Sequence, residues 1–137
     1  MRAQITAEPT LDPCAGWDRG RIEELAASSS NGRVGTVLVS ETDAVRVWHL
    51  VLQPGERIGF HRHVLDYFWT VLCDGRARSH YDDGSVREVA YRTGDTRHFA
   101  FGAGEHMTHD LENTGSGPLS FVTVEFKNGK NAPLALA

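Results

Sequence analysis

The stretch PGERIGFHRHVLDYFWTVLCDG, residues 54–75, places two histidines one residue apart in a chain that otherwise reads as strands and turns. On a β-strand, residues i and i+2 point to the same face, with Cα atoms about 6.5–7 Å apart. Two imidazoles at that spacing can approach one ion at about 2.0–2.1 Å from each nitrogen. His61 and His63 are therefore either a metal clamp, with Arg62 on the opposite face, or two surface histidines that are close by chance.

The segments around this stretch predict an all-β fold. They are short, rich in β-branched or aromatic residues, and separated by turn signals such as Asp-Gly and Pro-Gly. The expected strands are RVGTVLVS (33–40), AVRVWHLVLQ (44–53), YFWTVLC (67–73), RARSHY (76–81), VREVAY (86–91), RHFAF (97–101) and LSFVTVEF (119–126). Strands at about 8–12-residue spacing with almost no helix between them indicate a sandwich or barrel.

One segment is helical in pattern. WDRGRIEELAASS, residues 17–29, has apolar residues at helical spacing, and Asp18 is the expected N-cap. We therefore divide the chain into an N-terminal extension with a short helix (1–33), a barrel (34–127) and a C-terminal tail (128–137).

Composition narrows the possible functions. A chain of 137 residues is long enough for one domain. The net charge is −4 and the lysines and arginines are scattered, so the sequence shows no basic patch of the kind that binds nucleic acid. The apolar runs are too short to span a membrane. Cys14 and Cys73 show no repeated spacing, so we expect reduced thiols, with Cys73 a small buried hydrophobe, in a cytoplasmic protein.

Two motifs then give a resemblance. The chain resembles the cupin superfamily, whose first motif is G-x5-H-x-H-x(3,4)-E-x6-G. Gly55, His61, His63 and Gly75 stand in register with this motif. The superfamily implies a double-stranded β-helix (jelly-roll) barrel with a metal in its mouth, and often a dimer.

The second motif, G-x5-P-x-G-x2-H-x3-N, matches at Gly94, His109 and Asn113. Ala100 replaces the proline, and the loop to the histidine is four residues longer. The resemblance makes His109 the third metal ligand, because it keeps the H-x3-N spacing; His106 is the competing match.

The motif glutamate is missing. Its two allowed positions are Tyr67 and Phe68, and counting back from Gly75 selects Phe68 as the residue beside the ion. Thr70 and Leu72 would share that face. The other candidates for proton transfer or for shaping the pocket are Asp66, Tyr67 and His98.

Phe68 inside the barrel would put Tyr67, Trp69, Val71 and Cys73 on its outer face. An exposed apolar run of that kind is usually covered by another chain or by the chain's own extension. We therefore expect a homodimer, with the N-terminal segment packed on the barrel or crossing to the partner.

Three neutral imidazoles leave a divalent ion with its full charge, which favours small oxygen-rich or carboxylate ligands. Imidazole suits Fe, Zn, Ni and Cu, and Mn is a further candidate. The sequence predicts a small metalloenzyme of the dioxygenase or Lewis-acid isomerase, cyclase or lyase type. A non-catalytic cupin that binds a small molecule or metal is the alternative.

Overall fold

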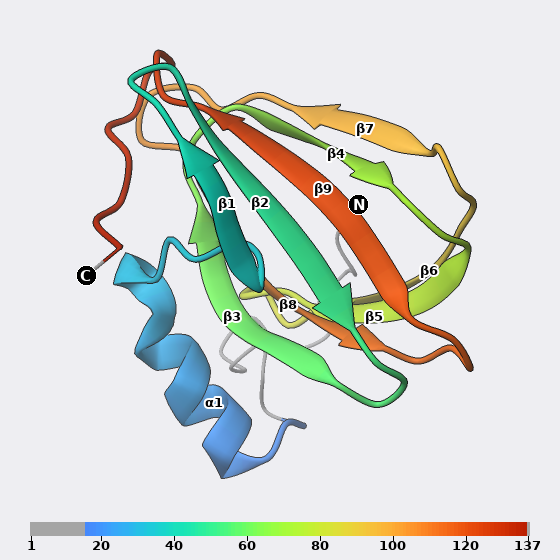
Figure 1. The fold of residues 1–137 in the computed structure, drawn as a ribbon. Coiled ribbons are helices and arrows are strands. Elements are labelled where there is room, and N and C mark those ends of the chain that lie inside the picture. Colours follow the sequence, from blue (N-terminus) through green and yellow to red (C-terminus); the bar gives the residue numbers. More distant parts are fainter. Residues whose placement is uncertain (1–15, 137) are drawn as a thin grey trace.

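Strand β2, Val45–Leu52, shows most clearly why the chain forms sheets with one buried face. Every second side chain along it is buried, from Arg46 to Leu52. Successive side chains of a strand point to opposite faces, so this alternation turns one face inward and leaves the other nearer to solvent. The computed structural model describes residues 16–136, and two sheets built in this way face each other across a common interior (Figure 1).

The larger sheet has the strand order β1-β2-β9-β4-β7 and the smaller one the order β3-β8-β5-β6. All neighbouring strands in both sheets are antiparallel. Besides β2, the strands are β1 Val37–Glu41, β3 Arg57–His63, β4 Tyr67–Val71, β5 Gly75–His80, β6 Val86–Tyr91, β7 Thr96–Phe99, β8 Met107–Asn113 and β9 Leu119–Phe126. The predicted all-β barrel is confirmed.

Two strands were absent from the set of expected strands. β3 and β8 carry the polar sequences RIGFHRH and MTHDLEN, which lack the run of β-branched residues that marks the other strands. They nevertheless pair with each other in the smaller sheet, and they carry the motif histidines.

The apolar core lies between the two sheets. Its buried side chains come from both sheets: Leu50, Leu52, Val71, Ala77, Leu111, Leu119 and Phe121. Gly75, the last glycine of the first motif, lies against this core, where a Cβ atom would stand 2.9 Å from Leu119 Cδ1. A side chain at this position would collide with the core, which explains the glycine.

Helix α1, Arg19–Ala26, lies along the outside of β3 (Figure 1). Asp18 is its N-cap as predicted, and its Oδ1 atom accepts a hydrogen bond of 2.8 Å from the Arg21 amide. A short 3-10 helix, η1 Ser28–Ser30, follows. Within residues 16–136, neither helix has the length and apolar character needed to cross a membrane.

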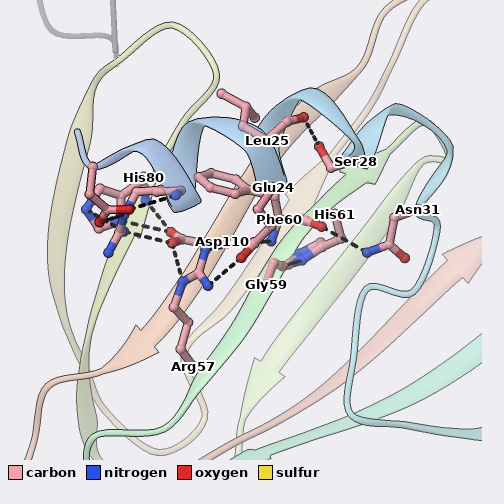
Figure 2. A network of polar contacts seen from close by, with 12 residues as sticks. Glu24, Leu25, Ser28, Asn31, Arg57, Gly59, Phe60, His61, His80 and Asp110 are labelled. Carbon is pink, nitrogen blue, oxygen red and sulfur yellow. Dashed lines mark hydrogen bonds and ion pairs between the residues drawn. The ribbon is translucent and has the colours of Figure 1, made fainter. Parts of the chain in front are cut away.

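A polar network fastens α1 to the barrel (Figure 2). Glu24 accepts hydrogen bonds from both terminal nitrogens of Arg57, at 2.9 and 2.8 Å, and from the Phe60 amide at 2.7 Å. Arg57 Nε donates to Asp110 at 2.7 Å. Asp110 is fully buried and also binds the amide of His80 at 2.6 Å and Arg21 at 3.3 Å.

The tail is ordered by contacts with the barrel. Asn131 donates to the carbonyl oxygens of Val64 and Gly102, each at 3.0 Å, and accepts from the Gly104 amide at 2.8 Å. Cys73 is partly exposed rather than buried, and Cys14 lies outside the described residues.

Candidate metal centre

Three histidines meet on the inner face of the smaller sheet. His61 and His63 lie on β3, and His109 lies on β8 directly opposite His61 in the strand register. Each offers a ring nitrogen, and the three nitrogens lie within 4.8 Å of one another. The ring centroids are 4.7–5.1 Å apart. The structure thus brings the three predicted side chains together.

The hydrogen bonds of the three rings are incomplete. His61 Nδ1 lies 2.8 Å from the carbonyl oxygen of Gly59, so it carries the proton and leaves Nε2 as the free electron-pair donor. The Nε2 atoms of His63 and His109 face each other at 3.2 Å. The Nδ1 atoms of these two rings are buried without a hydrogen-bond partner.

This geometry fits a metal ion. Nitrogens at about 2.0–2.1 Å from one tetrahedral ion lie about 3.3 Å apart, close to the observed separation between His63 and His109. One ion bound between the two Nε2 atoms would satisfy both of them. The Gly59 carbonyl is also the kind of partner that orients a metal-binding imidazole.

Burial also sets the charge of the site. It lowers the pKa of His61 to about 4 and the pKa of His63 and His109 well below the usual value. The neighbouring histidines lower the pKa of His63 further. All three rings are therefore neutral at pH 7, which is the state that binds metals.

The histidines open into a cavity of about 320 Å³. The rest of its wall is mainly apolar and aromatic, and it includes Leu50, Trp69, Tyr91, Phe99 and Phe121. A cavity of this size suits one small organic molecule beside an ion.

Tyr67 stands where the motif glutamate was expected. It is buried, lines the cavity, and stacks on His63 with ring centroids 4.3 Å apart. Burial raises the pKa of the Tyr67 phenol well above its usual value, so the group is neutral and protonated. The position beside the histidines thus holds a hydroxyl instead of a carboxylate.

The predicted placement of Phe68 in the cavity is wrong. Phe68 lies on the opposite face of β4, where its ring is 5.2 Å from His98 and 6.0 Å from Phe126. The strand ends at Val71, and a turn separates it from Gly75. Alternation holds only within a strand, so counting back across this turn gave the wrong face.

The same error affects the expected outer apolar face. Tyr67 and Val71 are buried, and Trp69 packs against the core cluster, so these residues offer no surface to a partner. The exposed large apolar side chains within residues 16–136 are Val37, Val39, Leu72, Val86, Val89 and Phe126.

Two other predicted site residues lie away from the cavity. His98 is exposed on the outer face of β7, because it pairs with the outward-facing Phe68. Asp66 accepts a hydrogen bond of 2.8 Å from the Phe101 amide and so holds the loop after β7. Neither belongs to the cavity wall.

The competing histidine, His106, is exposed and lines the cavity, but it stands outside the group of three. His80 is structural, since it belongs to the network around Asp110. Asn113 of the second motif is also structural. Its side chain donates to the carbonyl oxygens of Leu52 and Gly117 at 2.9 and 2.8 Å.

The cavity wall holds further charged residues that the sequence reasoning missed. Arg87 and Arg97 both line it, from β6 and β7. Alternation along the strands could have found them. Arg87 and Tyr91, like Arg97 and Phe99, are an even number of residues apart on expected strands and therefore share a face.

Comparison with known proteins supports the fold. The sequence matches no protein-family model and no curated protein. Among solved structures, a cupin domain from Bordetella pertussis Tohama I aligns with a TM-score of 0.59 at 21% identity, covering 66% of this chain and 90% of that one. An RmlC-like cupin family protein from Methanocaldococcus jannaschii, with a double-stranded β-helix fold, gives 0.51 at 21% identity and covers 74% and 85%.

A third structure is an uncharacterized conserved protein with a double-stranded β-helix domain from Klebsiella pneumoniae subsp. pneumoniae. It aligns with a TM-score of 0.54 at 26% identity, covering 85% of this chain and 90% of that one. The chain is therefore a small protein with the cupin fold, a double-stranded β-helix, and it carries three clustered histidines that could hold a metal.

Proposed function

We propose that this protein is a metal-dependent cupin enzyme that acts on a small oxygen-rich or carboxylate substrate. The observation that carries the proposal is the convergence of His61, His63 and His109, with the Nε2 atoms of His63 and His109 facing each other at 3.2 Å. These three side chains would hold one divalent ion, and the cavity beside them would hold the substrate.

The bound ion would supply either O2 chemistry, if it is iron, or Lewis-acid polarisation of a substrate oxygen, if it is redox-silent. The chain's own residues define the rest of the site. The Gly59 carbonyl fixes the orientation of His61. Tyr67 covers His63 and keeps a protonated hydroxyl in the cavity. Tyr67 is thus our candidate for hydrogen-bond or proton donation to the substrate.

The second candidate function is a non-catalytic cupin that binds a small molecule or metal. One observation favours it: the position beside the histidines holds Tyr67, whose buried phenol does not ionise at pH 7. A site without a carboxylate keeps ligand-binding capacity but lacks the general base that the motif would provide.

Metal analysis tests the proposal. Protein purified without chelators and then dialysed should retain about one divalent ion per chain, as three-histidine sites do. His63→Ala should lose the ion, and His98→Ala is the matched control, because His98 is an exposed histidine on the outer face of β7. Retention of the ion in His63→Ala would refute the centre.

Turnover separates the two functions. Metal-loaded protein is screened with carboxylates and 1,3-diketones, following O2 uptake and product formation, with His109→Ala as the inactive control. Saturable binding without turnover would favour the binding module. We also propose the homodimer and the cytoplasmic location expected from the sequence; light scattering and cell fractionation test them.

A further inference from the structure

Two arginines in the cavity wall favour a ligand with a negative charge. We propose that Arg87 and Arg97 form an anion-binding subsite, so that the molecule bound beside the metal centre carries a carboxylate or a similar anionic group. The inference deepens the proposed function and rests on it for the position of the ligand.

Register places both arginines on the inner faces of the sheets. Arg87 pairs with Ser79, and Arg97 pairs with Trp69; all four residues line the cavity. Directly opposite residues on paired strands share a face, so the two side chains extend from the inner surfaces of β6 and β7. These are the outermost strands of the two different sheets, and the cavity lies between them.

Both positive charges act on the same groups inside the cavity. Burial raises the pKa of Tyr91 to about 12, and Arg87 and Arg97 oppose this rise because they stabilise the phenolate. The same pair of opposing effects applies to Tyr81. Both arginines line the same cavity as Tyr81 and Tyr91, so their guanidinium groups can act on one ligand there.

Arg87 is partly buried and Arg97 is exposed, and they differ from several other arginines of the protein that acidic side chains hold. Arg21, Arg46, Arg57 and Arg78 each form an ion pair with a carboxylate. Within residues 16–136, no such pair joins Arg87 or Arg97 to an acidic side chain. Their donors remain available to a ligand.

Arg97 is also held in place by its neighbour. Its guanidinium carbon lies 5.0 Å from the ring centroid of Phe99, in a cation–π contact. Such a contact uses the face of the guanidinium and leaves its in-plane N–H groups free for a carboxylate.

Acidic residues at the cavity do not neutralise the pair by contact. Asp82 and Asp83 line the wall from the turn between β5 and β6. Asp83 accepts hydrogen bonds from the amide and the hydroxyl of Ser85, at 2.8 and 2.6 Å. The turn thus holds this carboxylate, while the two arginines face the ligand space.

The test compares two probes that differ only in a remote charge. 3,4-Dihydroxybenzoate and 3,4-dihydroxybenzamide offer the same diol to a metal, but only the first carries a carboxylate. We expect Zn(II)-loaded protein to prefer the carboxylate by at least about tenfold in calorimetric titration, the size expected for charged hydrogen bonds. Arg87→Gln and Arg97→Gln should each reduce this preference, and the double variant should abolish it.

Arg76→Gln is the matched control, because Arg76 is an exposed arginine on β5 outside the cavity wall. Thermal unfolding checks that every variant is folded. Equal affinity of the normal protein for both probes would overturn the proposal, and so would a preference that survives in the double variant.

A second arm needs no metal. Benzoate and benzamide are titrated into the metal-free protein, where benzoate should bind more tightly and lose that advantage in the double variant. Failure of the chain to retain zinc would count against the proposed function alone, because this arm still decides on the arginines. Equal binding of benzoate and benzamide in this arm would also overturn the subsite.

Discussion

The two faces of β3 and β8 differ in whether their buried polar atoms have hydrogen-bond partners. On the outer face, Asp110 is fully buried, and its oxygens accept from Arg57, Arg21 and His80 (Figure 2). On the inner face, one residue away, His109 keeps a buried Nδ1 atom without a partner. His63 repeats this pattern.

Chemistry explains the difference. A buried charge without partners costs several kcal/mol, so a polar group used for stability must be fully paired. In the described part of the chain, the histidine rings of the inner face have no acidic partner, and the Nε2 atoms of His63 and His109 face each other with electron pairs that a ligand can take. The paired network identifies the outer face as structural, and the converging rings identify the inner face as the binding surface.

The largest effect on stability should come from Asp110→Ala. The change leaves two arginines and the His80 amide without their buried acceptor, and we expect a loss of about 3–5 kcal/mol in the free energy of unfolding. Urea denaturation of the metal-free protein measures it. Glu112→Ala is the control on the same strand: its partly exposed carboxylate pairs only loosely with Arg78, at 3.8 Å, so the change should cost less than about 1 kcal/mol. Similar losses in the two variants would break the comparison.

Glu125, on β9 of the larger sheet, is another buried polar residue, and its hydrogen bonding can be compared with that of Asp110 and the histidines. It is buried, and its Oε1 accepts a hydrogen bond of 2.7 Å from Trp48 Nε1. Burial raises the pKa of Glu125 to about 7, above the ordinary 4.5. The folded state therefore holds an extra proton between about pH 4.5 and 7, and stability falls by about 3 kcal/mol as pH rises through this window.

Glu125→Gln should remove this fall, because the amide stays neutral and keeps an oxygen for Trp48. Relative to the normal protein, the variant should gain about 3 kcal/mol between pH 4 and pH 8. Denaturation curves at pH 4, 6 and 8 give the difference. A difference that stays constant with pH would show that Glu125 ionises normally.

His109→Ala should have the opposite effect to Asp110→Ala: a large loss of metal affinity and a small change in the stability of the metal-free protein. Metal affinity should fall by at least about 100-fold, because the third ligand is lost. The stability of the metal-free protein should change by less than about 1 kcal/mol, since the ring lines an existing cavity and its Nδ1 has no hydrogen bond to lose. Competition with a chromogenic chelator measures the affinity. A large loss of metal-free stability would assign His109 to the core.

The smallest effect is expected for Glu24→Ala, because Glu24 connects α1 on the outer face with the strand that carries the histidines. Glu24 binds the Phe60 amide next to His61, so Glu24→Ala should loosen β3 and lower metal affinity by less than about tenfold. The stability loss should be about 1 kcal/mol, because the Glu24 side chain is 38% exposed and its ion pair is screened. Glu23→Ala, an exposed neighbour on α1, should change neither quantity. Equal effects of the two substitutions would show that the helix does not support the centre.

The sequence was sufficient for the barrel and for the three histidines. Except for β3 and β8, the strands were indicated by β-branched and aromatic runs, and the histidines by H-x-H spacing and motif register. Both signals are local or family-wide, so no knowledge of long-range packing was needed.

Failures occurred where a turn or a distant contact decided the outcome. The turn after Val71 reversed the expected facing of Tyr67 and Phe68, and His98 moved outward with its strand partner Phe68. The role of Asp110 depends on residues as distant as Arg21 and Arg57, which no short pattern connects.

The segment after α1 has a consequence for how this protein behaves among other chains. β3 ends its sheet, and Asn31 covers that edge: its carbonyl accepts from the Arg62 amide at 2.8 Å, and its side chain donates to the Phe60 carbonyl at 2.9 Å. An edge strand whose backbone groups are already used cannot template a foreign strand. Without α1 and Asn31 this edge of the histidine-bearing strand would be exposed, so the segment from α1 to Asn31 also protects the protein against edge-to-edge aggregation.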